Sequence, residues 1–263
     1  MPVLEHQAAF TTFLEQLKCT QERVLILDYD GTLAPFNVDR DSAFPYPEIP
    51  AFLNRITERG TRLVMVTGRP AREVVVLGGV HPHPEIWGSH GLERLTLDGS
   101  YSVLKLPDED EANLLAAADA VRHEGFESNL EIKPGGVAVH WRGLSAVEIE
   151  DVRKKVLKSW RGLLSQHHLV LLEFDGGIEI KTAIANKGNA VERILSEASS
   201  HAVVAYLGDD LTDEDAFRAL KGKGLTILVR PEPRPSEAEF WLKPPEELIE
   251  FLHQWLAACG GKA

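Results

Sequence analysis

The chain has 263 residues, of which 44% are hydrophobic and 26% charged, so it can bury a sizeable core and is not expected to be disordered or fibrous. Its formal net charge of -12 disfavours nucleic acid or an anionic membrane surface as a partner, because both reward clustered Lys and Arg. We expect a soluble cytoplasmic protein, because the sequence has no secretory signal pattern at its start and no run of about 18 apolar residues. Its two cysteines are expected to be reduced thiols.

The first predicted elements are a short amphipathic helix over 8–18 and a buried strand that follows it. Val24 to Leu27 are four consecutive aliphatic residues, as in a strand of a parallel sheet. Asp28 and Asp30 follow at the carboxyl end, where open α/β sheets place their ligands. Two neighbouring carboxylates repel each other unless a cation neutralises them, so these hard oxygen ligands indicate Mg2+. The competing interpretation is an ordinary strand that ends in a solvated Asp turn.

A loop rich in Pro and Asp follows over 35–47, and it either covers the entrance to the site or is a plain surface loop. A helix is predicted over 49–59, and a second buried strand over 62–66 runs straight into Thr67-Gly68-Arg69. A hydroxyl and free backbone N–H groups between a strand and a helix form a natural phosphate cradle. A simple strand-to-helix turn would show the same pattern.

The next polar cluster lies at the end of a third strand, in Gly88-Ser89-His90-Gly91. A single buried histidine is usually a hydrogen-bonded core residue. The polar residues and glycines around His90 favour a position in the lining of a pocket.

Between about 104 and 181 the pattern changes to helix-strand-strand, and it occurs twice. This αββ repeat predicts an inserted domain with a four-stranded antiparallel sheet and two helices on one face. The predicted helices cover 108–123 and 145–160, and the strands cover 129–133, 137–142, 168–174 and 177–181.

Alternation along these strands places apolar side chains on one sheet face and polar side chains on the other. The polar face carries Glu131, Lys133, His140, Arg142, Glu179 and Lys181. It is either an ordinary solvated surface or a surface that closes over the active site and hydrogen-bonds a polyhydroxylated substrate.

Strand-helix alternation resumes after residue 185. Lys187 precedes a predicted helix over 189–198 and is either solvated or the point charge beside a transferring phosphoryl group. A buried strand over 202–207 then ends in a cluster of acids: Asp209, Asp210, Asp213, Glu214 and Asp215. Acidic residues suit a helix start, but so many directly after a buried strand are better explained by a cation. A strand over 226–229 and a helix over 246–258 complete the chain.

The predicted fold class is therefore α/β. A Rossmann-like, doubly wound parallel sheet forms the core, and an α+β cap with the αββ repeat is inserted in it. The predicted domains are 1–103 and 182–263 for the core and 104–181 for the cap.

The motifs in this order resemble those of the haloacid-dehalogenase-superfamily phosphatases: Asp28-Tyr29-Asp30-Gly31-Thr32, Thr67-Gly68-Arg69, Lys187 and Gly208-Asp209-Asp210-Leu211-Thr212-Asp213. The insert resembles the cap of one branch of that superfamily. The polar strands of the cap and the segments 88–91 and 208–217 are similar to those of trehalose-6-phosphate phosphatases. The resemblance covers about 21–256.

The resemblance implies that Asp28 attacks phosphorus to form an aspartyl phosphate, while Asp30 protonates the leaving sugar oxygen and then activates water. It implies Mg2+ bound by the Asp28 side chain, the Asp30 carbonyl and Asp209, with Asp213 in support. Thr67 and Lys187 would bind the nonbridging phosphate oxygens. The remaining substrate-binding candidates are Gly68, Arg69, His90, Glu131, Lys133, His140, Arg142 and Glu179.

Three alternatives stay open. Phosphatases of sucrose phosphate or of mannosyl- or glucosyl-phosphoglycerate share this kind of cap, and a phosphomutase could share the core. A response-regulator receiver also combines an acidic pocket with Thr and Lys, but it would need no cap and roughly half this length. A binding protein derived from a phosphatase would be expected to lack Asp28 or Asp30. The expected partner is a small-molecule sugar phosphate, and a monomer is the working expectation.

Overall fold

The structure is a computed structural model that describes residues 3–37, 39–164, 168–174 and 176–260. The chain forms two compact units, one made of Met1–Tyr101 with Asn186–Ala263 and the other of Ser102–Ala185. The assignment of functional domains with borders at 104 and 181 stays a prediction. No helix in the described part of the chain is long and apolar enough to cross a membrane.

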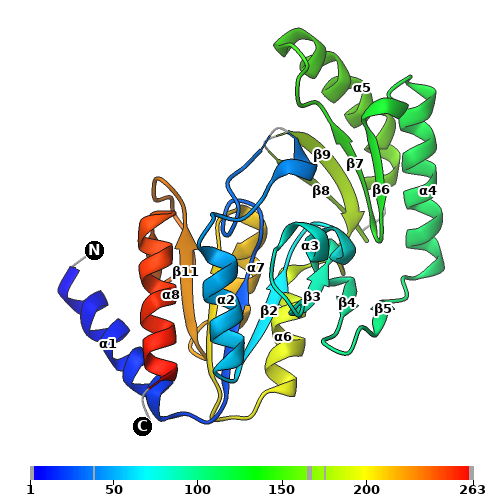
Figure 1. Cartoon of the computed structure of the whole chain (residues 1–263). Helices are drawn as coiled ribbons and strands as arrows, with labels where there is room; N and C mark the ends of the chain where they lie inside the picture. The colour runs from blue at the N-terminus through cyan, green and yellow to red at the C-terminus, as the bar shows by residue number, and fades with distance from the viewer. Residues whose placement is uncertain (1–2, 38, 165–167, 175, 261–263) are drawn as a thin grey trace. The chain divides into compact units, whose positions relative to one another are not determined.

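The first unit is organised around an eight-stranded sheet with the order β12-β11-β10-β1-β2-β3-β4-β5 (Figure 1), whose last strand, β5, crosses the border between the units. Neighbouring strands from β12 to β3 are parallel, and β4 is antiparallel to β3. The strands are β1 (Arg23–Leu27), β2 (Thr61–Val66), β3 (Glu85–Gly88), β4 (Glu93–Leu95), β5 (Tyr101–Val103), β10 (Val203–Gly208), β11 (Leu225–Val229) and β12 (Phe240–Leu242). This sheet confirms the predicted α/β class.

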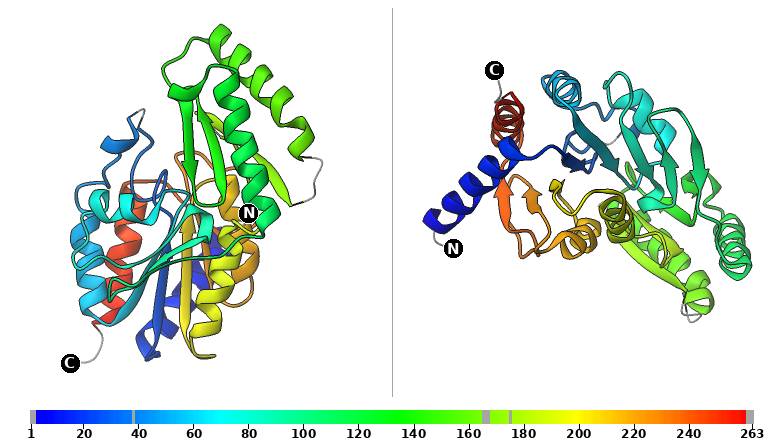
Figure 2. Two further views of the ribbon diagram at one scale, coloured as in Figure 1. Left: turned by 90° about the vertical axis from the view of Figure 1, so that its right-hand side faces the viewer. Right: turned by 90° about the horizontal axis from the view of Figure 1, so that it is seen from below.

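Helices cover both faces of this sheet, because successive side chains of its central strands point to opposite sides. Leu25 and Leu27 pack with α2, α3 and α8, whereas Val24 and Ile26 pack with α6 and α7. Seen from below, α8 and α2 lie on one side of the sheet and α6 and α7 on the other (Figure 2). The helices are α1 (Val3–Cys19), α2 (Ile49–Glu58), α3 (Ala71–Leu77), α6 (Lys187–Glu197), α7 (Glu214–Leu220) and α8 (Glu246–Cys259).

The second unit has a four-stranded antiparallel sheet with the order β6-β7-β9-β8 and two helices. Its elements are α4 (Asp108–His123), β6 (Leu130–Lys133), β7 (Gly136–His140), α5 (Ala146–Leu164), β8 (Leu169–Phe174) and β9 (Gly177–Thr182). The order of these elements confirms the αββ repeat. Val137, Val139, Ile178 and Ile180 are buried on the apolar face, but Ile132 on the edge strand β6 is 53% exposed, which alternation alone does not predict.

Several predicted boundaries are wrong. The first helix begins at Val3, α5 continues to Leu164, and β7 ends at His140, so Arg142 lies beyond the strand. Lys187 does not precede α6 but is its first residue, because the Asn186 side chain accepts a hydrogen bond from the N–H of Gly188 at 2.6 Å and caps the helix there. The short strands β4, β5 and β12 were not predicted.

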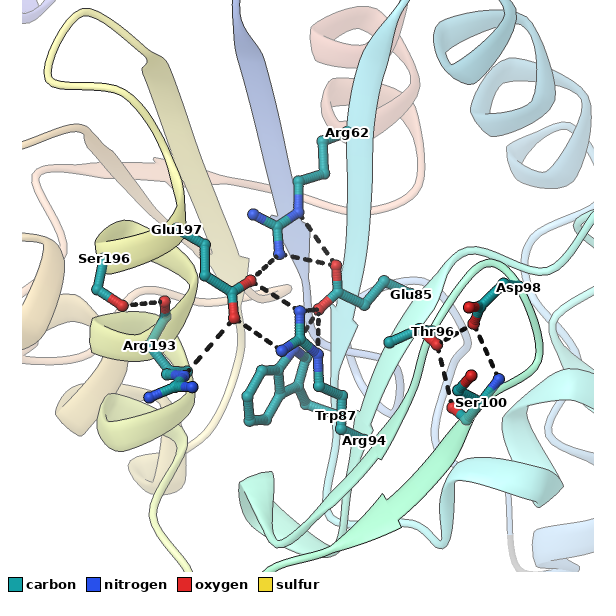
Figure 3. Close-up of polar contacts among 10 residues, drawn as sticks. All are labelled: Arg62, Glu85, Trp87, Arg94, Thr96, Asp98, Ser100, Arg193, Ser196 and Glu197. Carbon is teal, nitrogen blue, oxygen red and sulfur yellow. Dashed lines mark hydrogen bonds and ion pairs between the residues drawn. The ribbon is translucent and has the colours of Figure 1, made fainter.

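A ring of two arginines and two glutamates ties β2, β3 and β4 to the last turn of α6 (Figure 3). Arg62 lies 2.8 Å from both Glu85 and Glu197, and Arg94 lies 2.8 Å from Glu85 and 2.7 Å from Glu197. The Trp87 indole also donates to Glu85 at 2.9 Å. The hydrogen bond from Arg94 lowers the pKa of Glu197, although partial burial acts in the opposite direction. The ring fixes the far end of the helix that begins with Lys187.

Candidate active site

Three buried carboxylates meet at the carboxyl ends of two neighbouring strands. Leu27 of β1 pairs with Leu207 of β10, so Asp28 and Asp209 leave the sheet at the same edge. Asp213 follows in the 3-10 turn Leu211–Asp213. Carboxylate oxygens of Asp28, Asp209 and Asp213 all lie within 4.8 Å of one another. The sequence expectation of an acidic cluster at this edge is therefore matched by the geometry.

Lys187 reaches this cluster from the first turn of α6. Its Nζ lies 2.7 Å from Oδ1 of Asp28 and 2.8 Å from Oδ1 of Asp213. Burial acts to lower the pKa of Lys187, but the Asp213 and Asp28 carboxylates raise it above its ordinary value. The ammonium group therefore stays charged and neutralises part of the cluster.

One lysine leaves an excess of negative charge among three carboxylates. Burial raises the pKa of Asp28 to about 7, and Lys187 opposes that shift only in part. Burial, followed by the nearby Asp28, raises the pKa of Asp209 well above its ordinary value. Burial disfavours the ionised form of both carboxylates and Lys187 offsets this only in part, so the cluster suits a cation.

The hydrogen bonds of Asp213 and Asp209 distinguish an anchoring carboxylate from one that is available as a ligand. Asp213 accepts from the Tyr206 hydroxyl at 2.5 Å and from the N–H groups of Asp209 and Asp210 at 3.2 and 3.0 Å. By contrast, Oδ1 of Asp209 is buried and has no hydrogen-bond partner among the described residues. Asp209 therefore has an oxygen that a ligand could use, whereas Asp213 is engaged by the protein; the metal-binding roles of both stay predictions.

Gly31 makes room for the Asp209 carboxylate. Its φ of +80° is in the left-handed region, and a Cβ at this position would overlap the carboxylate of Asp209. A side chain at position 31 would therefore displace one of the three acids.

Asp30 is held by Arg69 in a bidentate ion pair. Nε of Arg69 lies 2.6 Å from Oδ2 of Asp30, and Nη2 lies 2.7 Å from Oδ1. The third nitrogen of the guanidinium, Nη1, donates to the carbonyl of Arg40 at 2.9 Å, and the group lies over the Tyr29 ring. Arg69 is buried, so its polar atoms are engaged by the protein itself. The expectation that Arg69 binds substrate stays a prediction, and its contacts in this structure favour the positioning of Asp30.

Thr67 and Gly68, in the turn after β2, meet His90, in the turn after β3. The Thr67 hydroxyl accepts a hydrogen bond from the N–H of Arg69 at 3.1 Å, and the N–H of His90 donates to the Thr67 carbonyl at 2.9 Å. The His90 ring lies so close to Gly68 that a Cβ there would be 2.8 Å from its Cε1. His90 thus lies beside the predicted phosphate cradle.

Ser89 and His90 have φ values of 48° and 56°, which non-glycine residues rarely adopt. Glu93 holds this strained loop: its Oε2 accepts from the Ala71 N–H at 2.7 Å and from the Ser89 hydroxyl at 3.3 Å. Tyr101 donates to Oε1 at 2.6 Å. Strain that is held by buried hydrogen bonds is typical of functional sites.

The polar residues of the second unit form pairs with one another. His140 and Glu131 are 2.6 Å apart, and Lys133 and Glu179 are 2.9 Å apart. The Lys133 and Glu179 side chains are only 8% and 3% exposed. Glu131 and Glu179 both pair with Ala138 of β7, from its two sides, so they lie on the same face of the sheet, as predicted. Arg142 lies in the turn beyond β7 and does not belong to this row.

The sequence interpretation missed three residues near the carboxylates. Tyr206 was assigned to a buried strand for its apolar character, yet its hydroxyl binds Asp213. Arg230 donates from Nη1 to the carbonyl of Asp209 at 3.0 Å. It directly follows β11, the same strand-end signal that identified Asp28 and Thr67. Phe36 lies against Gly31, and no local pattern indicates that contact.

Comparison with known proteins gives a family for this arrangement. The model of the trehalose-phosphatase family matches residues 26–245, which contain all the acids, Thr67 and Lys187. The chain belongs to the trehalose-phosphatase family. The match also includes the second unit, so family membership covers both parts of the fold.

Individual relatives of this trehalose-phosphatase family member extend over most of the chain. It is 31% identical to "Probable trehalose-phosphate phosphatase D" of Arabidopsis thaliana, over 95% of this chain and 72% of that protein. It is 32% identical to "Trehalose-phosphate phosphatase" of Mycobacterium avium (strain 104), over 88% of this chain but only 61% of that protein. The C. albicans trehalose-6-phosphate phosphatase C-terminal domain has the same fold, with a TM-score of 0.75, 20% identity and coverage of 95% and 96% of the two chains.

Proposed function

We propose that the chain hydrolyses trehalose 6-phosphate to trehalose and phosphate through an aspartyl-phosphate intermediate. The observation that carries the proposal is the buried cluster of Asp28, Asp209, Asp213 and Lys187 in a chain of the trehalose-phosphatase family. A receiver module is not supported, because the family match extends through the inserted second unit.

In the proposed first step, the Asp28 carboxylate attacks phosphorus and the bond from phosphorus to the sugar oxygen breaks. Asp30 gives its proton to that leaving oxygen, which requires one of its two oxygens to part from Arg69, because the guanidinium holds both in this structure. In the second step, Asp30 takes a proton from water, the water oxygen attacks phosphorus, and Asp28 is released as a carboxylate. Lys187 orients Asp28 throughout, since its Nζ is 2.7 Å from Oδ1.

The donor set fits Mg2+, because buried carboxylates with too little positive charge around them suit a hard cation. We propose that the Asp28 side chain, the Asp30 carbonyl and Asp209 hold it, and that Asp213 orients Asp209 through the hydrogen bond at 3.2 Å. When bound, Mg2+ would supply charge neutralisation between the nucleophile and the phosphoryl group.

Phosphate oxygens would be bound by the Thr67 turn and by Lys187. The Thr67 hydroxyl supplies a donor, and the lysine supplies a fixed positive charge as negative charge shifts in the transition state. Gly68 keeps this turn open against the His90 ring. Arg69 would act mainly by setting the position of Asp30.

We further propose that the polar face of the second unit selects the sugar. The candidates are Glu131, Lys133, His140, Arg142 and Glu179, with His90 from the first unit. The two pairs, Glu131 with His140 and Lys133 with Glu179, preorganise these side chains, which reduces the entropy lost when they bind hydroxyl groups.

Phosphate release from a panel of sugar phosphates in the presence of Mg2+ tests the proposal. The panel contains trehalose 6-phosphate, sucrose 6-phosphate and the mannosyl and glucosyl derivatives of phosphoglycerate. We expect the highest kcat/KM with trehalose 6-phosphate and no release in excess chelator. A higher kcat/KM for another member would overturn the substrate, and full activity in chelator would overturn the metal site.

A further inference from the structure

An exposed aromatic ring lies beside the carboxylate cluster of the first unit. A Cβ placed on Gly31 would be 2.8 Å from Cε2 of Phe36 and would also overlap the Asp209 carboxylate. Asp209 is buried, whereas Phe36 is 56% exposed. The ring and the carboxylate therefore adjoin the same small residue, and the ring is the one that faces solvent.

Residues 39–43, in the same loop as Phe36, make contacts with the site. The Tyr29 hydroxyl donates to the carbonyl of Ala43 at 2.8 Å, and Arg69, which holds Asp30, donates to the carbonyl of Arg40. Within the loop, the Ser42 hydroxyl donates to Asp39 at 2.6 Å and the Asn37 amide donates to the Ser42 carbonyl at 3.1 Å. The part of the loop that follows Phe36 is thus anchored to Tyr29, which precedes Asp30, and to Arg69, which holds Asp30.

An aromatic ring that remains exposed at such a position loses the stabilisation that burial would give it. A pyranose ring offers a face of C–H groups that carry slight positive charge, and an aromatic face is negative, so the two attract each other and exclude water. The phosphate of a sugar phosphate must reach Asp28, which places the attached sugar on the solvent side of the cluster, where Phe36 lies.

We infer that Phe36 is a specificity-determining residue that stacks against the sugar carrying the phosphate. This inference rests on the proposed function, since it concerns the sugar part of the same substrate. It assigns a role to the loop over 35–47, for which the sequence left two interpretations open. It also predicts that Phe36 does not raise kcat/KM for phosphate esters and anhydrides that carry no sugar.

The same loop provides a matched control. Phe44 is 57% exposed, so Phe44→Ala removes the same side chain at the same exposure. The test compares the parent, Phe36→Ala, Phe36→Tyr and Phe44→Ala. For each protein, kcat/KM is measured with trehalose 6-phosphate and with acetyl phosphate, which has no sugar, and the ratio of the two values is the readout.

We expect Phe36→Ala to lower this ratio about fivefold, mainly through KM for the sugar phosphate. Phe36→Tyr should restore most of the ratio, because it keeps the aromatic face. Phe44→Ala should leave the ratio at the parental value. An equal loss with both substrates would show that Phe36 only supports the carboxylates, and an unchanged ratio in Phe36→Ala would also overturn the inference.

The parent is assayed first, so that the two proposals fail separately. If it hydrolyses another sugar phosphate instead of trehalose 6-phosphate, the proposed substrate is wrong, and the Phe36 ratio is measured with the sugar phosphate that it does hydrolyse. If the parent hydrolyses acetyl phosphate but no sugar phosphate, both the substrate and the stacking role are overturned.

Discussion

Asp28→Asn is expected to abolish turnover and, in the absence of a divalent cation, to make the protein more stable. The amide has the shape of the carboxylate but is a poor nucleophile and a poor metal ligand, so catalysis is lost. Stability should rise because the substitution removes one negative charge from a buried cluster in which three carboxylates share one lysine.

The size of the gain follows from the pKa of Asp28, which burial raises from 3.8 to about 7. A rise of about three pKa units corresponds to about 4 kcal/mol by which the ionised form is disfavoured in the folded protein. The attraction of Lys187 for Asp28 is already included in this shift. We treat about 4 kcal/mol as an upper bound, and half of it would raise the melting temperature by about 5 °C.

The sign of the pH dependence follows from proton binding. Folded Asp28 binds a proton more tightly than the unfolded chain does, so its ionisation destabilises the parent as pH rises from 3.8 to about 7. The advantage of Asp28→Asn should therefore be complete near pH 8 and fall by more than half near pH 5. Added Mg2+ should stabilise the parent more than the variant and reduce the difference.

Thermal unfolding in chelator and in Mg2+, at both pH values, is the assay. Glu93→Gln is the control, because Glu93 is a buried carboxylate that accepts hydrogen bonds from Ala71, Ser89 and Tyr101, and its substitution should lower stability. An Asp28→Asn protein that is no more stable than the parent in chelator near pH 8 would refute the view that this cluster lacks neutralising charge.

Three further outcomes are expected. Asp30→Asn should be severe with sugar phosphates but milder in the first step with 4-nitrophenyl phosphate, whose leaving group needs no proton; equal losses in single-turnover assays would argue against an acid role. Glu131→Gln or Glu179→Gln should lower the ratio of kcat/KM for trehalose 6-phosphate to that for 4-nitrophenyl phosphate about tenfold to a hundredfold, and unchanged ratios in both would remove the second unit from sugar recognition. Glu197→Gln should lower stability by about 1 kcal/mol near neutral pH, because the fold favours the ionised Glu197 carboxylate, as its lowered pKa indicates. This stabilisation is present above pH 4.5 and is lost as the pH falls below that value. Urea unfolding that shows the same difference between parent and variant near pH 3 would contradict the assignment.

Strand periodicity predicted the sheet and the edge at which the acids lie. The four aliphatic residues Val24 to Leu27 predict that β1 is buried, and the structure shows this burial. Ligands bind at the carboxyl ends of the strands in this kind of fold, so the position of the site follows without knowledge of distant residues. Asp28, Thr67, Lys187 and Asp209 could therefore be selected from the sequence as residues next to buried strands or at a helix start.

The partners of these residues could not be predicted in the same way. Asp30 and Arg69 are 39 positions apart, and Arg94 and Glu197 are 103 positions apart. Periodicity reports which face of an element is buried, but not which distant side chain meets it. The role of the Tyr206 hydroxyl was missed for the same reason, because the hydrophobic pattern of a strand counts a tyrosine as apolar and does not indicate what its hydroxyl binds.

The ion pairs at the two ends of α6 have a mechanical consequence. Lys187 at its start is held by Asp28 and Asp213, and Glu197 at its end by Arg62 and Arg94. A helix of 11 residues is a stiff rod about 16 Å long. It cannot slide along its axis without breaking contacts at one tip, and a slide at one tip moves the other by the same amount. Salt, which weakens the partly exposed ring at Glu197, would therefore loosen the position of Lys187 through the helix rather than through the electric field.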